Sequence, residues 1–375
     1  MNYYLSPVKI AGGEERFVCP QSLVLNTYLG CRHDCVYCYA KFILQPLGRW
    51  RTVTPADVNI LNKILSDAER KRDMVSRLIQ QRVPFRFANI TDGFQDIEKV
   101  FRVSLEALKV LSRFDYPVII NTKGVIIAEP EYLEVICNMK VVVQMTLIWH
   151  QDWLVRMLEP HAPSATERLE ALMKLADAGV ITQVRFSPVF PMLNDEPEEF
   201  FHVLRQVKVK DVICEFVRLP LAKVYLEELN RRLGFDYLQM LRRSGYPIVK
   251  LRHWFKVAKP FIFDEYKRFK RLAEREGLNF YVCCEEQPQI NNWANCCGTD
   301  KYEGFENCMS WTIQMNGKRF LFKKEVSFEE YVEGFDIPYL EQFRRYWMAG
   351  KLEGSIYGLR FNRDRKTYSL RSDYV

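Results

Sequence analysis

The sequence lacks any long apolar run: no stretch approaches the roughly 20 residues that a membrane-spanning helix needs. Its first residues, MNYYLSPVKIAGGEERF, have neither the charged start nor the apolar stretch of a signal peptide. Internal repeats and low-complexity tracts are also missing, and a content of 48% hydrophobic and 27% charged residues argues against intrinsic disorder. We therefore expect a cytoplasmic globular protein without a membrane partner.

Charge of one sign is only slightly in excess. The 54 lysines and arginines outnumber the 47 aspartates and glutamates, which gives a formal net charge of +7. An excess of this size allows a nucleic-acid or other anionic partner without requiring one. The 375 residues suffice for one large core and a small appendage, and the sequence leaves the oligomeric state open.

From about residue 22 to 220, short apolar runs typical of strands alternate with amphipathic stretches typical of helices. Strands separated by helices predict a parallel sheet with right-handed crossovers. Six such units indicate the α/β class and a partial (β/α)6 barrel of the TIM type, whose chemistry lies at the carboxyl ends of the strands. The predicted strands are Leu23–Tyr28, Phe85–Ile90, Pro117–Asn121, Val141–Ile148, Gln183–Pro188 and Val212–Val217. The predicted helical stretches are Pro55–Gln80, Glu98–Phe114, Ser164–Ala178 and Glu198–Val207.

We divide the chain into three regions: an N-terminal lead-in at 1–21, the barrel at 22–279 and a cysteine-rich C-terminal extension at 280–375. At the start of the extension we expect a strand over Asn279–Cys284, followed further on by a β-hairpin around Asn316 and Gly317. The sequence ends in a basic segment that contains YGLRFNRDRKTYSLRS.

Three of the eleven cysteines, Cys31, Cys35 and Cys38, form a CxxxCxxC motif directly after the first predicted strand. Cysteine thiolates are the usual ligands of iron–sulfur clusters, and a compact loop can place three of them on three irons of a [4Fe–4S] cubane. The fourth iron then has no ligand within the motif and can bind the amino and carboxylate groups of S-adenosylmethionine. One electron from the cluster would split the sulfonium and yield a 5′-deoxyadenosyl radical, while the protein positions the substrate and excludes water.

A structural zinc site is the alternative for this motif, with His33 as the fourth ligand. Paired CxxC motifs are the commoner zinc spacing, however, and this motif has only one. Its position after the first strand and its aromatic flanks, Tyr37 and Tyr39, favour the cluster.

The segment from about Leu23 to Asp195 resembles the spore photoproduct lyase-like branch of the radical S-adenosylmethionine (radical SAM) superfamily. Four segments carry the resemblance: YLGCRHDCVYCYA, ITDGFQDIEKVFRVSLEALKVL, NTKG, and LEPHAPSATERLEALMKLADAGV followed by SPVFPMLND. The resemblance implies the same fold, S-adenosylmethionine as a cofactor beside the cluster, and a one-electron donor such as flavodoxin or ferredoxin.

The same resemblance implies roles for single residues. Tyr37 and Tyr39 correspond to aromatic partners of the cofactor, and Thr91 and Asp92 to contacts of its amino group. Lys123 corresponds to a lysine that reaches the cofactor carboxylate, and Thr146 to a contact of its ribose. Each residue also has a structural interpretation.

Those structural interpretations are ordinary ones. Thr91 and Asp92 can cap the following helix, and Lys123 can be a solvated loop residue. Glu159 and Arg168, from the fourth segment, can form an ion pair that only supports the fold.

Two departures from the family pattern concern the substrate. Spore photoproduct lyases proper carry a hydrogen-donating cysteine where this sequence has Ile90. The family's TDPYQP segment also becomes TDGFQD. The resemblance therefore extends to the cofactor machinery and not to the parent DNA-repair reaction.

A second group of cysteines follows residue 280. Cys283, Cys284, Cys296, Cys297 and Cys308 lie within 26 residues. They can bind an auxiliary [4Fe–4S] cluster, form a zinc site, or supply the hydrogen donor that is missing at position 90. Because neighbours on an extended chain point in opposite directions, we expect each Cys-Cys pair to supply one ligand.

Two further cysteines have apolar neighbours in the sequence. Cys137 lies in EVICNM and Cys214 in DVICEFV. We expect both to be small core residues rather than ligands.

The sequence thus predicts a radical SAM enzyme that abstracts hydrogen from a macromolecule, with nucleic acid as the preferred substrate. The family precedent, the basic excess and the arginines and aromatic residues between Tyr357 and Arg371 support this hypothesis. A solvated edge strand explains that tail equally well. The alternatives are a radical enzyme acting on a peptide or small metabolite, and a non-catalytic iron–sulfur or zinc protein that binds nucleic acid.

Overall fold

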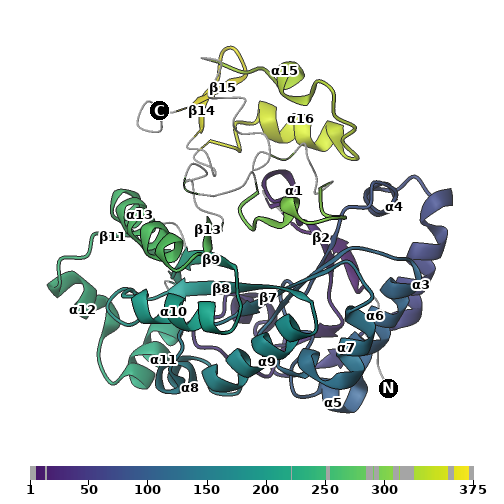
Figure 1. Cartoon of the computed structure of the whole chain (residues 1–375). Coiled ribbons are helices and arrows are strands. Elements are labelled where there is room, and N and C mark those ends of the chain that lie inside the picture. The colour runs from purple at the N-terminus through teal and green to yellow at the C-terminus, as the bar shows by residue number, and fades with distance from the viewer. Residues whose placement is uncertain are drawn as a thin grey trace.

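An eight-stranded sheet forms the centre of the molecule, as the computed structural model shows (Figure 1). The structure describes residues 6–12, 15–220, 222–250, 254–283, 290, 295–306, 312, 325–353 and 359–370. In spatial order the strands are β1 (Val8–Ile10), β2 (Leu23–Leu25), β5 (Phe85–Phe87), β6 (Val118–Thr122), β7 (Val141–Thr146), β8 (Ile181–Val189), β9 (Asp211–Phe216) and β13 (Asn279–Val282). All neighbours from β2 to β13 are parallel, and only β1 is antiparallel to its partner.

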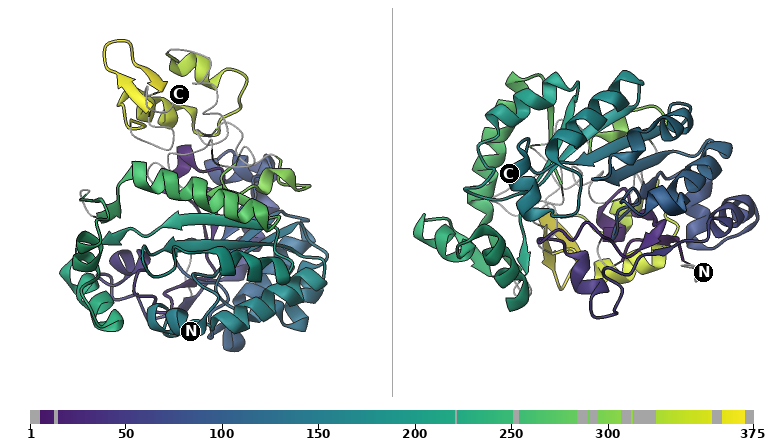
Figure 2. Two further views of the ribbon diagram at one scale, coloured as in Figure 1. Left: turned by 60° about the vertical axis from the view of Figure 1, so that its left-hand side comes forward. Right: turned by 90° about the horizontal axis from the view of Figure 1, so that it is seen from below.

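The six predicted strands are confirmed, and the α/β partial barrel with them. The sheet order ends in β1 on one side and β13 on the other, so the barrel stays open between these two strands. Helices cover its outer face (Figure 2). They are α3 (Val58–Asp67), α4 (Met74–Gln80), α5 (Glu98–Phe101), α6 (Val103–Arg113), α7 (Pro130–Ile136), α8 (Asp152–Leu158), α9 (Ala165–Asp177), α10 (Glu198–Gln206) and α13 (Lys259–Arg275). In addition, α11 (Lys223–Leu233) packs against α8, and α12 (Tyr237–Arg243) packs against α11.

Local sequence signals set several helix boundaries. Ser164 and Glu167 form a reciprocal capping box at the start of α9, which satisfies two backbone N–H groups. The single predicted stretch Pro55–Gln80 is instead divided, because the side chain of Asp73 accepts from the Ser76 N–H and begins α4 anew. Among the described residues, no helix is long and apolar enough to cross a membrane.

The two faces of the sheet differ in polarity. Side chains alternate along each strand, so Val184 and Phe186 of β8 point outward into the main core while Gln183 and Arg185 point inward. Gln144 of β7 donates to Gln183, and Arg185 donates to Gln144 at 3.1 Å. The interior of the partial barrel is therefore lined by hydrogen-bonded polar side chains.

Both predicted region boundaries cross this sheet. β1 comes from the lead-in at 1–21 and pairs with β2, with Val8 opposite Leu25. β13 lies on both sides of the boundary at 279/280 and pairs with β9. The predicted hairpin around Asn316 and Gly317 falls outside the described residues.

Residues 295–306 close the amino-terminal end of the barrel. Phe305 packs against Ile119 and Val142 on the inner face. The Lys301 ammonium and the Tyr302 hydroxyl both bond to Asp211, the first residue of β9. This segment makes the floor of the barrel, at the end away from the carboxyl ends of the strands.

The last part of the chain forms a small unit at the same end of the barrel (Figure 1). It contains α15 (Phe328–Val332), α16 (Leu340–Met348), β14 (Leu359–Asn362) and β15 (Thr367–Leu370). The ring of Phe343 stacks on Phe17 of α1 (Glu15–Val18) with centroids 5.1 Å apart. Asp336 binds Arg77 of α4, the helix that leads into the amino end of β5. The described part of this unit therefore lies at the amino end of the barrel strands, away from their carboxyl ends.

Candidate cluster and cofactor site

The three cysteines of the CxxxCxxC motif lie on one loop between β3 (Tyr28–Leu29) and α2 (Ala40–Leu44). Cys31 and Cys35 are buried, Cys38 is half-buried, and all three are free thiols. The loop turns tightly at Gly30, where φ is +92° and a Cβ would overlap the Thr52 carbonyl oxygen. The loop lies at the carboxyl end of β2, where this fold places its chemistry.

A fully buried glutamine holds this loop in shape. Gln95 donates from Nε2 to the Gly30 carbonyl at 3.1 Å and accepts at Oε1 from the Arg32 N–H at 2.9 Å. Its two contacts thus lie on either side of Cys31. Gln95 lies within the TDGFQD segment, but the sequence alone does not indicate this role, because only the folded loop brings Gln95 beside the motif.

Asp92 ties three segments together from the end of β5. Its Oδ1 accepts from the Phe94 N–H at 2.8 Å and from the Thr122 hydroxyl at 2.7 Å. Its Oδ2 accepts from the Lys123 N–H at 2.7 Å and lies 3.2 Å from His33 Nε2. Burial would raise the pKa of Asp92, but His33 and these donors outweigh it and hold the pKa well below the usual range.

Both carboxylate oxygens of Asp92 are therefore occupied by groups of this chain, as in a capping and bracing role. Its neighbour Thr91 donates to the Tyr28 carbonyl at 2.6 Å. The geometry brings both residues beside the cysteine loop, where sequence analysis expected contacts to the cofactor amino group.

Behind Cys35 lies a buried cluster of charges. Lys123 Nζ lies 3.9 Å from Glu159 Oε1 and 5.7 Å from the centre of the Tyr37 ring, and the Tyr37 hydroxyl donates to Glu159. Arg168 binds the other oxygen of Glu159 at 2.5 Å, which confirms the ion pair. It also donates to the carbonyl of Thr146, the last residue of β7, at 3.0 Å.

Lys123 is thus a half-buried cation paired with Glu159 and not a fully solvated loop residue. Burial would lower its pKa, but the charges of Cys35 and Glu159 raise it, so the ammonium form persists. Since Glu159 is shared by Lys123, Arg168 and Tyr37, the lysine keeps a capacity to pair with a further carboxylate. Tyr37 and Lys123 lie together, and Thr146 is linked to them only through the bond from Arg168 to its carbonyl. Their roles toward the cofactor stay a prediction.

Tyr39 and Ile90 lie differently. Tyr39 is 46% exposed, and its hydroxyl donates to the Asn89 carbonyl at 2.7 Å, so its ring is at the surface of the site. Ile90 packs with Cys31 and Cys38 in one apolar cluster. Where the family has its hydrogen-donating cysteine, this chain therefore has an isoleucine that packs against the cysteine loop.

The donor set fits a [4Fe–4S] cluster. Burial raises the pKa of Cys31 to about 12, and raises the pKa values of Cys35 and Cys38 as well, so iron binding must displace three protons. Across the described ranges, no three Cys, His, Asp or Glu side chains are grouped closely enough for one metal ion. Three thiols on one loop match the three-cysteine ligand set that a [4Fe–4S] cluster can use, whereas a structural zinc ion takes four protein ligands.

A second group of thiols meets inside the barrel. Cys296 and Cys297 have sulfur atoms 3.6 Å apart, and Cys283, at the end of β13, contacts both. Arg185 donates to the Cys283 sulfur at 3.1 Å, and the Cys297 carbonyl accepts from Gln183. We call Cys283, Cys296 and Cys297 the lumen thiols.

The expectation that Cys296 and Cys297 point in different directions is wrong. They lie in a turn, closed by a bond from the Gly298 N–H to the Asn295 carbonyl, and not on an extended segment. Cys284 and Cys308 lie outside the described residues.

The two isolated cysteines differ from each other. Cys214 is a buried core residue on β9, as predicted. The prediction for Cys137 is wrong, because it caps the carboxyl end of α7 on the outer surface and is exposed.

Strand register places the lumen thiols near the cofactor residues. Thr146 of β7 pairs with Arg185 of β8, and Arg185 in turn pairs with Ile213 of β9. Arg185 therefore stands between Thr146 and Cys283 on the inner face. Nearby on β6, the buried Oδ1 of Asn121 has no hydrogen-bond partner among the described residues.

Residues 25–204 match the family model of the radical SAM superfamily. The chain is 23% identical over 193 residues to an uncharacterized protein of Methanocaldococcus jannaschii, and 26% identical over 190 residues to one of Mycobacterium tuberculosis. These matches cover 51% and 50% of this chain, and 66% and 55% of the two relatives. The chain thus spans less than two thirds of the curated relatives it matches.

The structure is also similar to solved structures of spore photoproduct lyase. One, complexed with dinucleoside spore photoproduct, gives a TM-score of 0.53 at 18% identity and covers 74% of this chain and 79% of that one. Another, a mutant with bound AdoMet and dinucleoside spore photoproduct, gives a TM-score of 0.52 at 17% identity, over 70% and 76% of the two chains. At such identities the likeness concerns the fold.

The radical SAM superfamily implies an enzyme that uses a [4Fe–4S] cluster and S-adenosylmethionine. The matched segment contains the three cysteines of the motif, the braces Asp92 and Gln95, and the half-buried cation of Lys123. Residues 25–204 therefore match a radical SAM domain, within a chain whose fold is like that of spore photoproduct lyase.

Proposed function

We propose that this chain reductively cleaves S-adenosylmethionine at a [4Fe–4S] cluster held by Cys31, Cys35 and Cys38. The observation that carries the proposal is the half-buried ammonium of Lys123 beside this loop, where its Nζ lies 5.7 Å from the centre of the Tyr37 ring and 3.9 Å from Glu159 Oε1. The cluster and cofactor together supply the one-electron chemistry that yields a 5′-deoxyadenosyl radical.

The chain's own residues hold the reactants in place. Lys123 binds the cofactor carboxylate by charge, and Tyr37 and Thr146 line the same space. Asp92 acts as a positioning residue, because it fixes His33 and the Lys123 backbone N–H rather than presenting a free oxygen. Burial around Cys35 and Glu159 keeps water away from these groups, which strengthens each electrostatic contact.

The first experiment is anaerobic reconstitution with iron and sulfide, followed by S-adenosylmethionine and dithionite, with 5′-deoxyadenosine as the product measured. We expect about four irons at the motif, and both iron and product to be lost in Cys35→Ala. Cys137 is an exposed cysteine on the outer surface, so Cys137→Ala is the matched control and should keep both the bound iron and the product. Product formation by Cys35→Ala would contradict the assignment.

For the substrate, we propose hydrogen abstraction from a nucleic acid. The fold likeness to a lyase whose structure contains dinucleoside spore photoproduct supports this, as does the net charge of +7. The basic tail contributes less than its composition suggests. Tyr368 packs against Trp347 in the core of the C-terminal unit, at the end of the barrel away from the site.

A peptide or small polar metabolite is the second candidate, favoured by the polar inner face. Arg185 and the unpartnered Oδ1 of Asn121 could receive anionic and donor groups of a small substrate. The two candidates separate in one assay. The chain is incubated with S-adenosylmethionine and deuterated oligonucleotides, and deuterium in the 5′-deoxyadenosine product is measured. Deuterium in the product supports a nucleic-acid substrate. Product that contains no more deuterium than in a reaction without oligonucleotide refutes it.

We also propose that the lumen thiols belong to a second functional group, either an auxiliary cluster or zinc completed by further cysteines, or a hydrogen donor. Their burial beside Arg185 supports a role in the barrel interior. About eight irons per chain would indicate an auxiliary cluster, whereas about four irons with one zinc would indicate a zinc site. About four irons and no zinc would leave a thiol role.

A further inference from the structure

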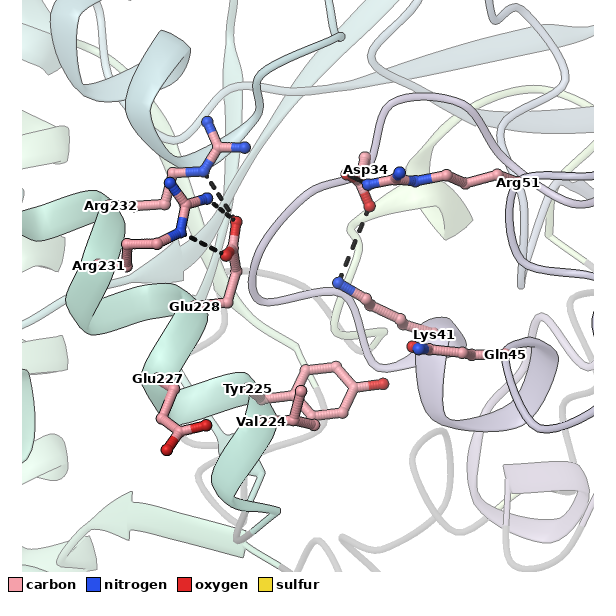
Figure 3. Close-up of a pocket in the computed structure, with 10 residues that line it drawn as sticks. All are labelled: Asp34, Lys41, Gln45, Arg51, Val224, Tyr225, Glu227, Glu228, Arg231 and Arg232. Atoms are coloured by element: carbon pink, nitrogen blue, oxygen red, sulfur yellow. Dashed lines mark hydrogen bonds and ion pairs between the residues drawn. The ribbon is translucent and has the colours of Figure 1, made fainter.

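A polar cavity of about 440 Å³ lies beside the cysteine loop, between α2 and α11 (Figure 3). Lys41, Gln45 and Arg51 line one side of it, and Val224, Tyr225 and Arg231 line the other. Figure 3 shows the Tyr225 ring directed from α11 toward Lys41 and Gln45. We call these six residues, together with the exposed turn after α2, the α2–α11 surface.

The charges on this surface are arranged with cations outward. Arg51 is 69% exposed, whereas its partner Asp34 is 6% exposed. Arg231 is 65% exposed, and its partner Glu228 only 27%. Glu227 is the exposed exception, and it pairs with Lys223. An approaching partner therefore meets guanidinium groups first, with their carboxylates lying deeper.

An apolar side chain lies among these cations. Val224, on the first turn of α11, lines the cavity and is 60% exposed. Exposed apolar groups next to arginines are typical of protein–protein interfaces. A nucleic acid would instead favour unpaired cations without exposed aliphatic groups.

The surface lies directly outside a cluster ligand. Cys38 is separated from α2 by a single residue, and its carbonyl accepts from the Lys41 N–H at 3.3 Å. Lys41 Nζ lies 5.4 Å from the centre of the Tyr225 ring. Two residues that line the cavity are thus in contact with each other, and one of them is bonded to the backbone of a proposed cluster ligand.

We propose that the α2–α11 surface docks an acidic one-electron carrier protein that reduces the cluster. This rests on the proposed function, since each cleavage of S-adenosylmethionine consumes one electron. The carrier is oxidised by one electron and the cluster is reduced by one, with no change of bonding in either protein. Positive charge around the entry point accelerates encounter with an acidic partner, and this effect weakens as salt is added.

The test compares two reductants on the reconstituted full chain. Arg231→Glu and Val224→Asp change the surface on α11 without touching the cysteine loop. With dithionite, both variants should form 5′-deoxyadenosine within about twofold of the wild-type rate. With reduced flavodoxin as the donor, we expect a loss of about tenfold or more for Arg231→Glu, and a smaller loss at high salt. Arg113→Glu on α6 and Met173→Asp on α9 are matched exposed controls and should retain flavodoxin-driven activity.

Three results would overturn the docking proposal. One is flavodoxin-driven activity that falls no further in the surface variants than in the controls. Another is an equal loss with both reductants, which would give the surface a structural role in the cluster site. The third is weakened binding of a labelled DNA duplex with unchanged flavodoxin kinetics, which would assign the surface to nucleic acid. Absence of product from the wild type with dithionite would instead refute the proposed function itself.

Discussion

The buried pair of Arg168 and Glu159 offers the sharpest test of how this site is held together. Both side chains are fully buried, their closest atoms are 2.5 Å apart, and Arg168 also donates to the Thr146 carbonyl. Arg168→Met keeps the apolar stem of the side chain but leaves the Glu159 carboxylate without its main cation. Breaking a buried pair in this way costs about 3–5 kcal/mol, because a charge stays buried without its partner.

The second consequence concerns Lys123. Its ammonium is already 3.9 Å from Glu159, so among the described residues it becomes the one remaining cation paired with that carboxylate. We therefore expect Arg168→Met to weaken S-adenosylmethionine binding by about tenfold or more, a change of about 1.4 kcal/mol or more. The double variant Glu159→Gln with Arg168→Met removes the buried charge, while the amide oxygen can still accept from Tyr37. It should regain at least about 2 kcal/mol of the lost stability.

Urea unfolding of the iron-free chain, followed by far-UV circular dichroism, measures the stability of both variants. Calorimetric titration of the reconstituted chain measures the affinity for S-adenosylmethionine. A loss of less than about 1 kcal/mol in Arg168→Met would refute the reasoning, since surface pairs contribute that little. A double variant no more stable than Arg168→Met would show that packing, and not the unpaired charge, sets the cost.

Three further predictions follow from single contacts. Gln95→Leu removes the bonds on either side of Cys31, so bound iron should fall to less than about half with unchanged circular dichroism; full iron content would contradict this. Gly124→Ala drives a Cβ into the Phe94 carbonyl, so this variant should be insoluble or lose about 3 kcal/mol or more of its free energy of unfolding in urea. In the control Gly12→Ala, the added Cβ meets no atom within 4 Å, and the free energy of unfolding should not change. Burial would raise the pKa of Glu159, but its cations lower it, so its stabilisation is present above the ordinary carboxyl pKa and lost as the pH falls. Between about pH 6 and about pH 3, the wild type should lose more stability than Glu159→Gln, and equal losses would contradict the assignment.

Most of the barrel could be predicted because its signals are local. Buried parallel strands such as Val141–Thr146 are continuous apolar runs, and the intervening helices have apolar residues on one face. The cysteine spacing was equally local, since three ligands on one loop need no distant contact. The limits of the barrel were harder, because β1 and β13 become strands only by pairing with β2 and β9.

The supporting residues of the site could not be predicted in the same way. Gln95 is 65 residues from Gly30, and nothing in its own segment shows that it bonds to the cysteine loop. Asp92 was expected at the cofactor, because its type and position match the family. In the folded chain both of its oxygens accept from the chain's own donors. A motif identifies which residues matter, but the partner of each depends on the tertiary structure.

The lumen thiols show the same limit and its functional consequence. In the sequence they belong to the cysteine-rich extension at 280–375, which the predicted boundary sets apart from the barrel. In the structure Cys283 follows the edge strand β13, and Gln183 of β8 fixes the turn that carries Cys297 across 114 residues of chain. These pairings put the thiols on the inner face, next to Arg185 and level with the strand end that carries Thr146. A second cluster or a hydrogen donor at this place would act from within the barrel, on the same substrate that the radical reaches.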